Sequence, residues 1–326
     1  MNSSFKYITF LFFVLLFSSC EKVIEFNGEV TDPMVVVNSI VTPDLVVSAQ
    51  VSLSRFFLSD STTYSFVNNA TVSLMVNGKQ KENLKFSSKG TYVGTYKPLI
   101  GDSLRLNVQV PNENTVSCGT SIKSQSNVLP IDTSRVYTGE KTPLTDIILP
   151  SSDHQGGIDT IGMRYGRTLK FILKFNDNPI LQNYYRLVVQ TRTYTTSGYN
   201  SDYSFSFDDI VSGNAPKDAV GPPNSLVTNK FNIFTDDTFN GGQYSLAFSI
   251  QDDRAVYFPG HYKAIPKKEV YINLQSISKS YYLYLHTRAS IKINSFFAEP
   301  VQVFSNVDGG IGIMGSYTSN TVKIVL

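Results

Sequence analysis

The sequence predicts a mainly β protein, with an N-terminal immunoglobulin-like or transthyretin-like β-sandwich followed by a second β-rich domain with one short helix. The composition is the first observation behind this prediction, because Val, Thr and Ser are abundant beside 19 Tyr and 22 Phe, and such residues favour strands. The second is that apolar and polar residues alternate over short segments separated by turn residues. A hydrophobic fraction of 41% indicates a globular chain rather than a disordered one.

The first domain is predicted at residues 30–127, and its strands are short and closely spaced. Residues 34–40 and 47–53 are the apolar runs at its start. Residues 103–110 alternate apolar and polar side chains throughout, which is the period of a half-buried strand. A series of such strands is typical of a two-layered β-sandwich.

The strand at residues 71–76 gives the most specific expectation for this domain. Val72, Leu74 and Val76 should face the core, because alternate side chains of a strand point to opposite faces. The intervening residues are expected on the other face: Thr71, Ser73 and Met75. Asn77-Gly78 follows at once and is typical of a two-residue hairpin turn.

The second domain is predicted at residues 128–326. It begins with a turn-rich connector at 130–164, in which we find little periodicity. Strands are expected at residues 169–175, 184–191, 243–251, 270–274 and 321–326. These segments are rich in Val, Ile, Tyr and Phe, so the second domain is also expected to be mainly β.

One short helix is expected near the C-terminal end of the second domain. Ser278 is a residue type that caps helix N-termini. Ile277, Tyr281 and Leu285 recur every four residues around it, which is the spacing of one helix face.

The N-terminus carries a short apolar segment, residues 7–17, behind the positive charge of Lys6. A membrane-spanning helix needs roughly 20 apolar residues, so this segment is too short to span. It fits the apolar part of a secretory signal, with Ser18 and Ser19 as the small residues at the cleavage side. We therefore predict that residues 1–19 are a signal peptide that is removed.

Cys20 follows these small residues directly. Residues 17–20, Phe-Ser-Ser-Cys, resemble the lipobox of bacterial lipoproteins, with Phe17 where leucine is commonest. The resemblance implies that Cys20 receives a diacylglycerol and a further acyl chain, after which residues 20–29 form a short tether. Each buried CH₂ contributes about 0.8 kcal/mol, so two or three acyl chains anchor a protein firmly to a membrane. The alternative is an ordinary secretory signal with a chance cysteine.

The charge of the mature chain is almost balanced. Of 28 Lys and Arg only Lys6 is removed with the signal, which leaves 27 against 26 Asp and Glu. This balance argues against nucleic acid as a partner, because nucleic-acid binding needs a concentrated basic surface. With Cys20 lipidated, Cys118 has no cysteine partner, and we expect it to be a small buried hydrophobe.

No motif in the sequence points to a catalytic residue, a metal ligand or a cofactor, and we predict none of the three. His154, His261 and His286 are far apart and lack the spacing of a zinc site. Acidic pairs are interpreted as solvated turns, and they stand at residues 208–209, 236–237 and 252–253. None of these pairs has the spacing of a calcium-binding loop.

Residues 310–315 spell G-x-G-x-x-G, the pattern of a dinucleotide-binding loop. That mechanism requires a helix after the loop to meet the phosphates, whereas the residues that follow Gly315 predict a strand. We therefore predict that residues 306–315 are a structural and partner-facing element of the second domain. Its glycines would permit positive φ angles and close backbone contact.

Exposed aromatic residues are the remaining candidate for a functional surface. Tyr194, Tyr199 and Tyr203 lie in a stretch where aromatic and small polar residues alternate, which indicates an exposed hairpin. Their rings could stack on sugars or pack on a partner, and the alternative is packing along an edge strand.

The C-terminal run FFAEPVQVFSNVDGGIGIMGSYTS resembles the closing signature of a Bacteroidetes lipoprotein family, domain of unknown function 4249. The matching residues are Phe297, Glu299, Pro300, Ser305, Asn306, Gly309, Gly310, Gly312 and Gly315. Met314 departs from the family, which more often has Phe there. Further segments that resemble the family cover nearly all of the mature chain: VVVNSIVTPD, NATVSL, FTDDTFNGG and SKSYYLYL.

This resemblance implies a lipid-anchored outer-membrane protein, and such proteins are often encoded beside TonB-dependent receptors whose N-termini carry a carboxypeptidase-regulatory-like domain. It supplies no catalytic residues. The leading hypothesis is therefore a non-enzymatic accessory lipoprotein that is the partner of a TonB-dependent transporter. The alternative is a stand-alone surface protein that binds glycan or peptide, and a hydrolase is a third, disfavoured class. The sequence does not distinguish the cell surface from the periplasmic face.

Overall fold

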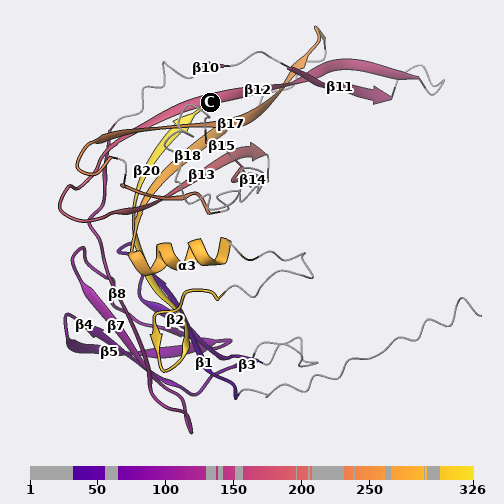
Figure 1. Cartoon of the computed structure of the whole chain (residues 1–326). Coiled ribbons are helices and arrows are strands. Elements are labelled where there is room, and N and C mark those ends of the chain that lie inside the picture. Colours follow the sequence, from indigo (N-terminus) through magenta and orange to yellow (C-terminus); the bar gives the residue numbers. More distant parts are fainter. Residues whose placement is uncertain are drawn as a thin grey trace, which may run out of the picture.

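The computed structural model describes residues 32–55, 65–129, 137–138, 142–150, 157–195, 197–204, 206–207, 231–237, 239–260, 266–289, 291 and 302–326. Over these residues the chain forms one sheet of 14 strands, a second sheet of 6 strands and one helix. Figure 1 shows the strands in a lower and an upper group, with the helix between them. The mainly β, sandwich-like fold class predicted from the sequence is confirmed.

The lower group is a β-sandwich whose two layers are parts of the 14-stranded sheet. Its strands are β1 (Val35–Val41), β2 (Ser48–Leu53), β3 (Ser65–Phe66), β4 (Thr71–Val76), β5 (Lys79–Ser88), β6 (Thr91–Val93), β7 (Ser103–Gln109) and β8 (Val116–Ser121). Strand β5 belongs to both layers, because it pairs with β4 on one side and with β6 on the other. Between the layers lies a core whose members include the fully buried Val37, Val51, Leu74, Leu106 and Val108.

The pattern predicted for β4 is confirmed. Val72 and Leu74 are fully buried, and the half-buried Val76 packs against the same core. The next two residues form the expected tight turn, with φ angles of 50° at Asn77 and 79° at Gly78. The alternation of side chains in this strand therefore sets which face is buried.

The upper group consists of two stacked layers. One is the six-stranded sheet of β9 (Asn127–Val128), β10 (Tyr137–Thr138), β11 (Thr142–Pro150), β12 (Ile158–Asn176), β15 (Ser206–Phe207) and β17 (Gln243–Tyr257). The other contains β13 (Tyr184–Thr195), β14 (Gly198–Asp202), β16 (Ile233–Thr235), β18 (Lys268–Ile277) and part of β20 (Ile311–Val325). Aromatic rings fill the space between the layers: Phe171 stacks on Phe248 at 5.4 Å, and Phe175 meets Tyr185 edge-on at 5.2 Å.

The turn-rich connector predicted at residues 130–164 is wrong where the structure describes it. Strands β10 and β11 and the first residues of β12 lie within this range. Strands β11 and β12 pair as an antiparallel hairpin. The periodicity was weak because Leu144, Ile148 and Ile158 are all exposed, so no alternation between a buried and a solvated face marks these strands.

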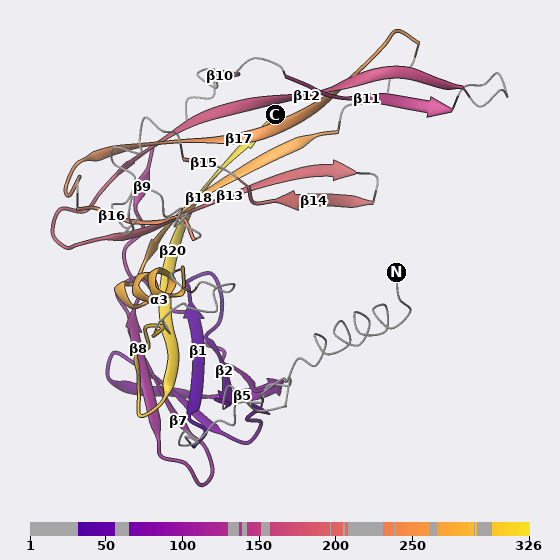
Figure 2. The same ribbon diagram turned by 45° about the vertical axis from the view of Figure 1, so that its right-hand side comes forward.

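Strand β20 connects the two groups. Its first residues pair in parallel with β1 of the lower sandwich, and its later residues pair antiparallel with β18 of the upper layer. Strand β19 (Val307–Asp308) pairs with β8. The C-terminal residues were predicted to belong to the second domain alone, but they pair with strands of both groups. Figure 2 shows β20 running from one group to the other.

The expected helix is α3 (Lys279–Ala289), and it lies against β20 and β13 (Figure 1). The Ser278 hydroxyl accepts a hydrogen bond from the Tyr281 amide at 3.3 Å, as expected of an N-cap residue. Tyr281 and Leu285 are buried in a small cluster together with Ile277. No helix among the described residues is long and apolar enough to cross a membrane.

Several residues singled out in the sequence lie outside the described part of the chain. They are Cys20 with the signal and tether, and Phe297, Glu299, Pro300, His154 and His261.

Candidate ligand-binding surface

Strand register brings a row of polar side chains together on the outer face of the upper layer. Arg192 of β13 lies opposite Glu269 of β18, and two positions along β18 Tyr271 lies opposite Lys323 of β20. Because side chains two positions apart share a face, these residues project on the same side of the sheet. Residues of the inter-sheet core, such as Val270 and Ile272, occupy the other face.

The three tyrosines predicted as a candidate surface lie on this outer face. Tyr194 and Tyr199 are opposite each other in the β13–β14 hairpin, and their ring centroids are 5.7 Å apart. The Tyr203 hydroxyl accepts a hydrogen bond from Gln190 Nε2 at 2.9 Å. Tyr199 is 49% exposed and Tyr203 is 59% exposed, so both present large aromatic surfaces to solvent.

Cations lie over the faces of these rings. The Arg192 guanidinium is 4.7 Å from the centre of the Tyr199 ring and 4.2 Å from that of Tyr271. Lys267 lies 5.3 Å from the centre of the Tyr194 ring. Such cation–π contacts hold the rings and the charged groups in fixed relative positions.

Glu269 is the centre of this surface, and its side chain is covered by four hydrogen-bond donors. Lys267 Nζ lies 2.8 Å and Lys323 Nζ 2.7 Å from Oε1, while the hydroxyls of Tyr194 and Tyr271 donate to Oε2 at 2.6 and 2.8 Å. The lysine and tyrosine donors hold the pKa of the Glu269 carboxyl far below its usual range. The same contact raises the pKa of Tyr194 to about 12, because its hydroxyl donates to the carboxylate.

This arrangement is suited to recognition rather than to proton transfer. A carboxylate held ionised by four donors is a poor general base, because its pKa is far from neutral pH. Exposed aromatic rings and fixed cations instead offer stacking and hydrogen-bonding positions to a ligand or a partner. We refer to Tyr194, Tyr199, Tyr203, Arg192, Tyr271, Glu269, Lys267 and Lys323 as the aromatic–cation surface.

Sequence reasoning found the tyrosines of the β13–β14 hairpin but missed the other members of the aromatic–cation surface. Arg192, Glu269 and Lys323 stand far apart in the chain, and only the pairing of β13, β18 and β20 unites them. One pattern in the sequence could have indicated some of the missed members. Lys267, directly before β18, and Glu269 and Tyr271 within it recur with period two, which indicates one polar face of a strand.

A second exposed feature is the end of the upper six-stranded sheet. Strands β11 and β12 form a hairpin that extends beyond the neighbouring strands, together with the end of β17 (Figure 2). Its large apolar side chains are exposed: Leu144, Ile148, Leu149, Ile158, Val256 and Phe258. We call these strand ends, residues 142–150, 158–164 and 255–258, the apolar arm.

The glycine-rich C-terminal segment lies at the contact between β20 and β1. Gly312 has a φ of 122°, and a Cβ atom there would collide with the backbone of Val37. Asn306 Nδ2 donates to the carbonyl oxygens of Gly119 and Met314, both at 2.9 Å. Gly312 and Gly315 lie in a strand, not in a loop before a helix. Together with Asn306, they keep the start of β20 close to β1 and β8.

Of the remaining signature residues in the described chain, Ser305, Gly309 and Gly310 precede β20, and Gly315 lies within it. Gly309 has a φ of 76°, Gly310 stands so close to β1 that a Cβ would lie 2.5 Å from the Val35 carbonyl oxygen, and Ser305 accepts a hydrogen bond from the Val307 amide at 3.3 Å. A Cβ on Gly315 would lie 2.7 Å from the Tyr281 Cβ. These contacts account for the small side chains of the turn by close packing.

The interpretation of the acidic pairs as solvated turns is wrong for two carboxylates. Asp236 is buried and accepts a hydrogen bond from the Asn183 amide at 2.8 Å. Asp252 is also buried, within β17. Cys118 is a free, buried thiol in β8, and burial raises its pKa to about 12, as expected of an inert side chain. In the described part of the chain no three potential metal ligands cluster.

Fold and surface together define a sandwich-like β protein with an exposed aromatic and cationic face. The sequence matches the family described as "Domain of unknown function (DUF4249)" over residues 21–323. The chain therefore belongs to this family. The comparison with curated proteins finds no match.

Two solved structures are distantly similar. One is a structure that explains the promiscuous specificity of carbohydrate-binding modules from the β-sandwich superfamily. It is 12% identical in sequence, the match covers 71% of this chain and 97% of that chain, and the TM-score is 0.16. The other is the M60 catalytic domain with the CBM51-1 and CBM51-2 domains of Clostridium perfringens ZmpB, 8% identical, with 91% and 40% covered and a TM-score of 0.18. Likeness of this degree carries no argument about function.

Proposed function

We propose that this protein is a non-enzymatic Bacteroidetes lipoprotein of the outer membrane, anchored through Cys20, that docks on a TonB-dependent transporter. The apolar arm is the observation that carries the docking proposal. Six large hydrophobic side chains are exposed at this end of the sheet, among them Ile158 at 66%. Water contact with so much apolar surface is unfavourable, and a concentration of exposed apolar side chains at one end of a sheet is typical of a protein interface.

The geometry of the arm supports a partner larger than a small molecule. Five of the side chains lie on the paired strands β11, β12 and β17, and Phe258 directly follows β17. Adjacent strand residues such as Ile148 and Leu149 point to opposite faces, so the apolar side chains cover both faces of an extended hairpin rather than line a pocket. Burial of apolar surface contributes roughly 25 cal/mol per Å², so covering several of these side chains would supply a large part of a stable association.

The anchor is tested first. Replacement Cys20→Ala removes the thiol that receives the lipid, and we expect the protein to leave the membrane fraction because its acyl chains are lost. Mass spectrometry of the mature N-terminus is the direct measurement. An unmodified N-terminal peptide in the wild type would contradict the anchor.

Docking is tested by co-purification after mild detergent extraction. The double replacement Ile148→Asp and Ile158→Asp places charges in the apolar arm, and we expect loss of the co-purified transporter without loss of folded protein. Leu99→Asp is the matched control, because Leu99 is 65% exposed in the lower sandwich. Co-purification that survives the arm replacements, or that Leu99→Asp abolishes equally, would contradict docking through the arm.

The aromatic–cation surface favours a second candidate function, the binding of glycan or peptide by the protein alone. Exposed rings that cations hold in place are suited to stacking against a sugar or a peptide side chain. On a glycan and peptide array, Tyr199→Ala should then abolish a signal that Phe86→Ala preserves. Phe86 is the control because it is an aromatic residue of the lower sandwich with a comparable exposure of 47%.

A further inference from the structure

The outer face of β13, β18 and β20 continues past the aromatic–cation surface towards α3. Asn273 and Gln275 lie on this face, because they follow Glu269 and Tyr271 at intervals of two along β18. Helix α3 covers the far end of the same face, where it packs on Ile277. Asn273 and Gln275 therefore lie between α3 and the aromatic–cation surface.

The side-chain amides of these two residues lack hydrogen-bond partners. Asn273 Oδ1 and Gln275 Oε1 are buried, and neither oxygen accepts a hydrogen bond from any residue that the structure describes. Gln275 as a whole is 8% exposed. A buried polar group without a partner costs about 1–3 kcal/mol, so two of them side by side on one face require an explanation. A ligand that donates hydrogen bonds to these oxygens would remove the cost.

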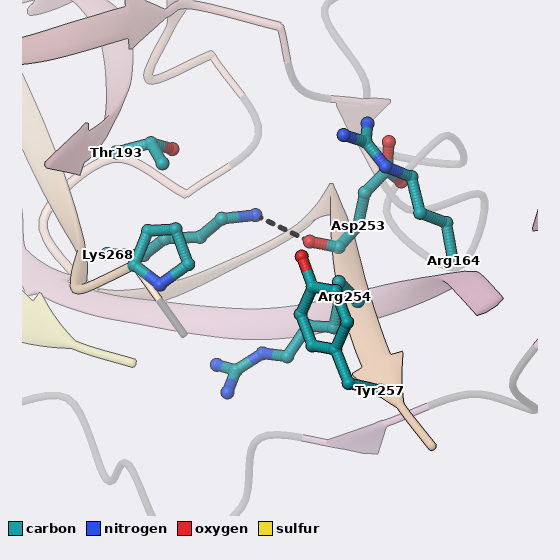
Figure 3. Close-up of a pocket in the computed structure, with 8 residues that line it drawn as sticks. Arg164, Thr193, Asp253, Arg254, Tyr257 and Lys268 are labelled. Atoms are coloured by element: carbon teal, nitrogen blue, oxygen red, sulfur yellow. Dashed lines mark hydrogen bonds between the residues drawn. The ribbon is translucent and has the colours of Figure 1, made fainter. Parts of the chain in front are cut away.

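The inward face of the same strand shows the contrast. Lys268 reaches across to β17, where its Nζ donates to the Asp253 carbonyl oxygen at 2.9 Å (Figure 3). The same Nζ lies 2.6 Å from the buried Asp252 carboxylate. Further along this face, the Ser276 hydroxyl shares a hydrogen bond with that of Ser126 at 2.8 Å. The polar side chains that hold the layers together are thus partnered, whereas the two outward amides are not.

Positive charge predominates on the outer face. Arg186 and Arg192 of β13 and Lys323 of β20 project from it, and Lys267 directly precedes β18. Glu269 is the sole carboxylate among the described residues that the register of β13, β18 and β20 places on this face. Four cationic side chains against one carboxylate give a local charge of about +3, which attracts an anionic ligand.

The strand pairing favours a sugar chain over a peptide as this ligand. An extended peptide commonly binds by adding its backbone to a free strand edge, but β18 is paired with β13 on one side and with β20 on the other. Only side chains are therefore available on this face. Sugar hydroxyls both donate and accept hydrogen bonds, as side-chain amides do, and sugar rings can stack on the exposed Tyr199 and Tyr203.

We propose that this face binds an acidic oligosaccharide that lies along β18, from the exposed tyrosines of the aromatic–cation surface to Asn273 and Gln275. Four residues separate Gln275 from Tyr271, about 13 Å of strand, so the ligand is a chain of sugars rather than one sugar. The proposal rests on the second candidate function, binding by the aromatic–cation surface, and names its ligand class. It does not depend on docking through the apolar arm.

Arg192 is placed to receive an acidic group of this ligand. It donates to Gln190 Oε1 through Nε at 3.1 Å, and its terminal nitrogens bond to no residue that the structure describes. Guanidinium groups bind carboxylates through paired N–H donors. The Tyr199 and Tyr271 rings already hold this guanidinium in place, so binding costs little ordering of the side chain.

The test is isothermal titration of the full chain, purified in mild detergent, with tetragalacturonate and tetramannuronate as acidic probes. The methyl esters of both keep the sugar rings but lack the negative charge. We expect saturable binding of at least one acid, about tenfold weaker binding of its ester, and affinity for the acid that falls as NaCl is raised. A tetraglutamate peptide carries the same number of carboxylates without sugar rings, and we expect it not to bind.

Two variants locate the binding site. Asn273→Leu and Gln275→Met replace each amide with an apolar group of similar shape, and each should weaken binding of the acidic probe about fivefold, the loss typical of one hydrogen bond. Neither should lower the midpoint of urea unfolding, because no hydrogen bond to the two buried oxygens is lost. Asn107→Leu is the matched control, a half-buried Asn of β7 in the lower sandwich, and should leave binding unchanged.

The proposal is overturned if neither acid binds, if the esters or tetraglutamate bind as tightly as the acids, or if both amide variants keep wild-type affinity. Failure of the second candidate function is a different result. If a neutral glycan or a peptide gives an array signal that Tyr199→Ala abolishes while neither acid binds, the aromatic–cation surface is a binding site and the acidic ligand class is wrong. If the array shows no signal that depends on Tyr199, both are wrong.

Discussion

Asp252 is the residue whose environment most depends on the folded chain. Its side chain is 1% exposed and is held by Arg167, Arg254 and Lys268 from three different strands. The sequence shows only an acidic pair with Asp253, and no local pattern reveals which member is buried. The alternation of side chains along β17 decides which of the two carboxylates is buried. Residue 252 shares the inward face of the strand with the buried Phe248 and Ile250.

Replacement Asp252→Asn should therefore destabilise the protein strongly. It leaves three cations without their shared carboxylate, and breaking a buried ion pair in this way typically costs about 3–5 kcal/mol. Urea denaturation measures the change in the free energy of unfolding. Asp253→Asn is the control, because the adjacent carboxylate is exposed and should change this free energy by less than about 0.5 kcal/mol. Equal effects of the two replacements would contradict the assignment.

The same carboxylate predicts the direction of acid sensitivity. Burial alone would raise the pKa of Asp252, but the bonds from Lys268, Arg167 and Arg254 lower it below the ordinary value of 3.8. The unfolded chain then binds this proton more readily, so the contribution is fully present above about pH 4 and is lost as pH falls through the folded pKa. In parallel urea denaturation series at falling pH, the wild type should lose more stability below about pH 4 than Asp252→Asn does. Identical slopes for the two proteins would contradict the stabilising role.

At the scale of elements, β20 needs glycine where it passes β1. Gly312→Ala adds a Cβ that meets the Val37 backbone and also forces a φ of 122° on a residue with a side chain. We expect a loss of about 4 kcal/mol in the free energy of unfolding, since strain and overpacking add. Gly78→Ala is the comparison, because its φ of 79° is also positive but nothing lies within 4 Å of the added Cβ. That variant should lose only about 1–2 kcal/mol, and losses of equal size would contradict the close contact.

Elements with a local signature were the ones that could be predicted. The turn at Asn77-Gly78, the alternation in β4 and the cap at Ser278 each depend on neighbouring residues and are present in the structure. The β11–β12 hairpin was missed because its apolar residues are exposed, so the usual contrast between faces is absent. The parallel pairing of β1 with β20 could not be predicted either, because it joins residues at opposite ends of the chain.

At the scale of the whole molecule, β20 joins the lower sandwich and one of the two upper layers into one continuous sheet, and the apolar arm extends from the upper group (Figures 1 and 2). Residues of the candidate surfaces, like the elements, could be predicted only where they are close together in the sequence. The tyrosines in and directly after the β13–β14 hairpin could be found because they are close in sequence, whereas the Glu269 network and the ion pairs of Asp252 depend on distant strands. A tether at the N-terminus and an interface on the arm would together present the protein to a neighbour in the same membrane.

The central claim is docking through the apolar arm, and site-specific photo-crosslinking in intact cells tests it most directly. A photoreactive residue at position 158 should form an adduct with a TonB-dependent transporter, whereas the same residue at position 99 should not. Ile158 and Leu99 are 66% and 65% exposed, so the comparison separates an interface from mere accessibility. Mass spectrometry identifies the adduct. No transporter adduct from position 158, or equal adducts from both positions, would contradict the account.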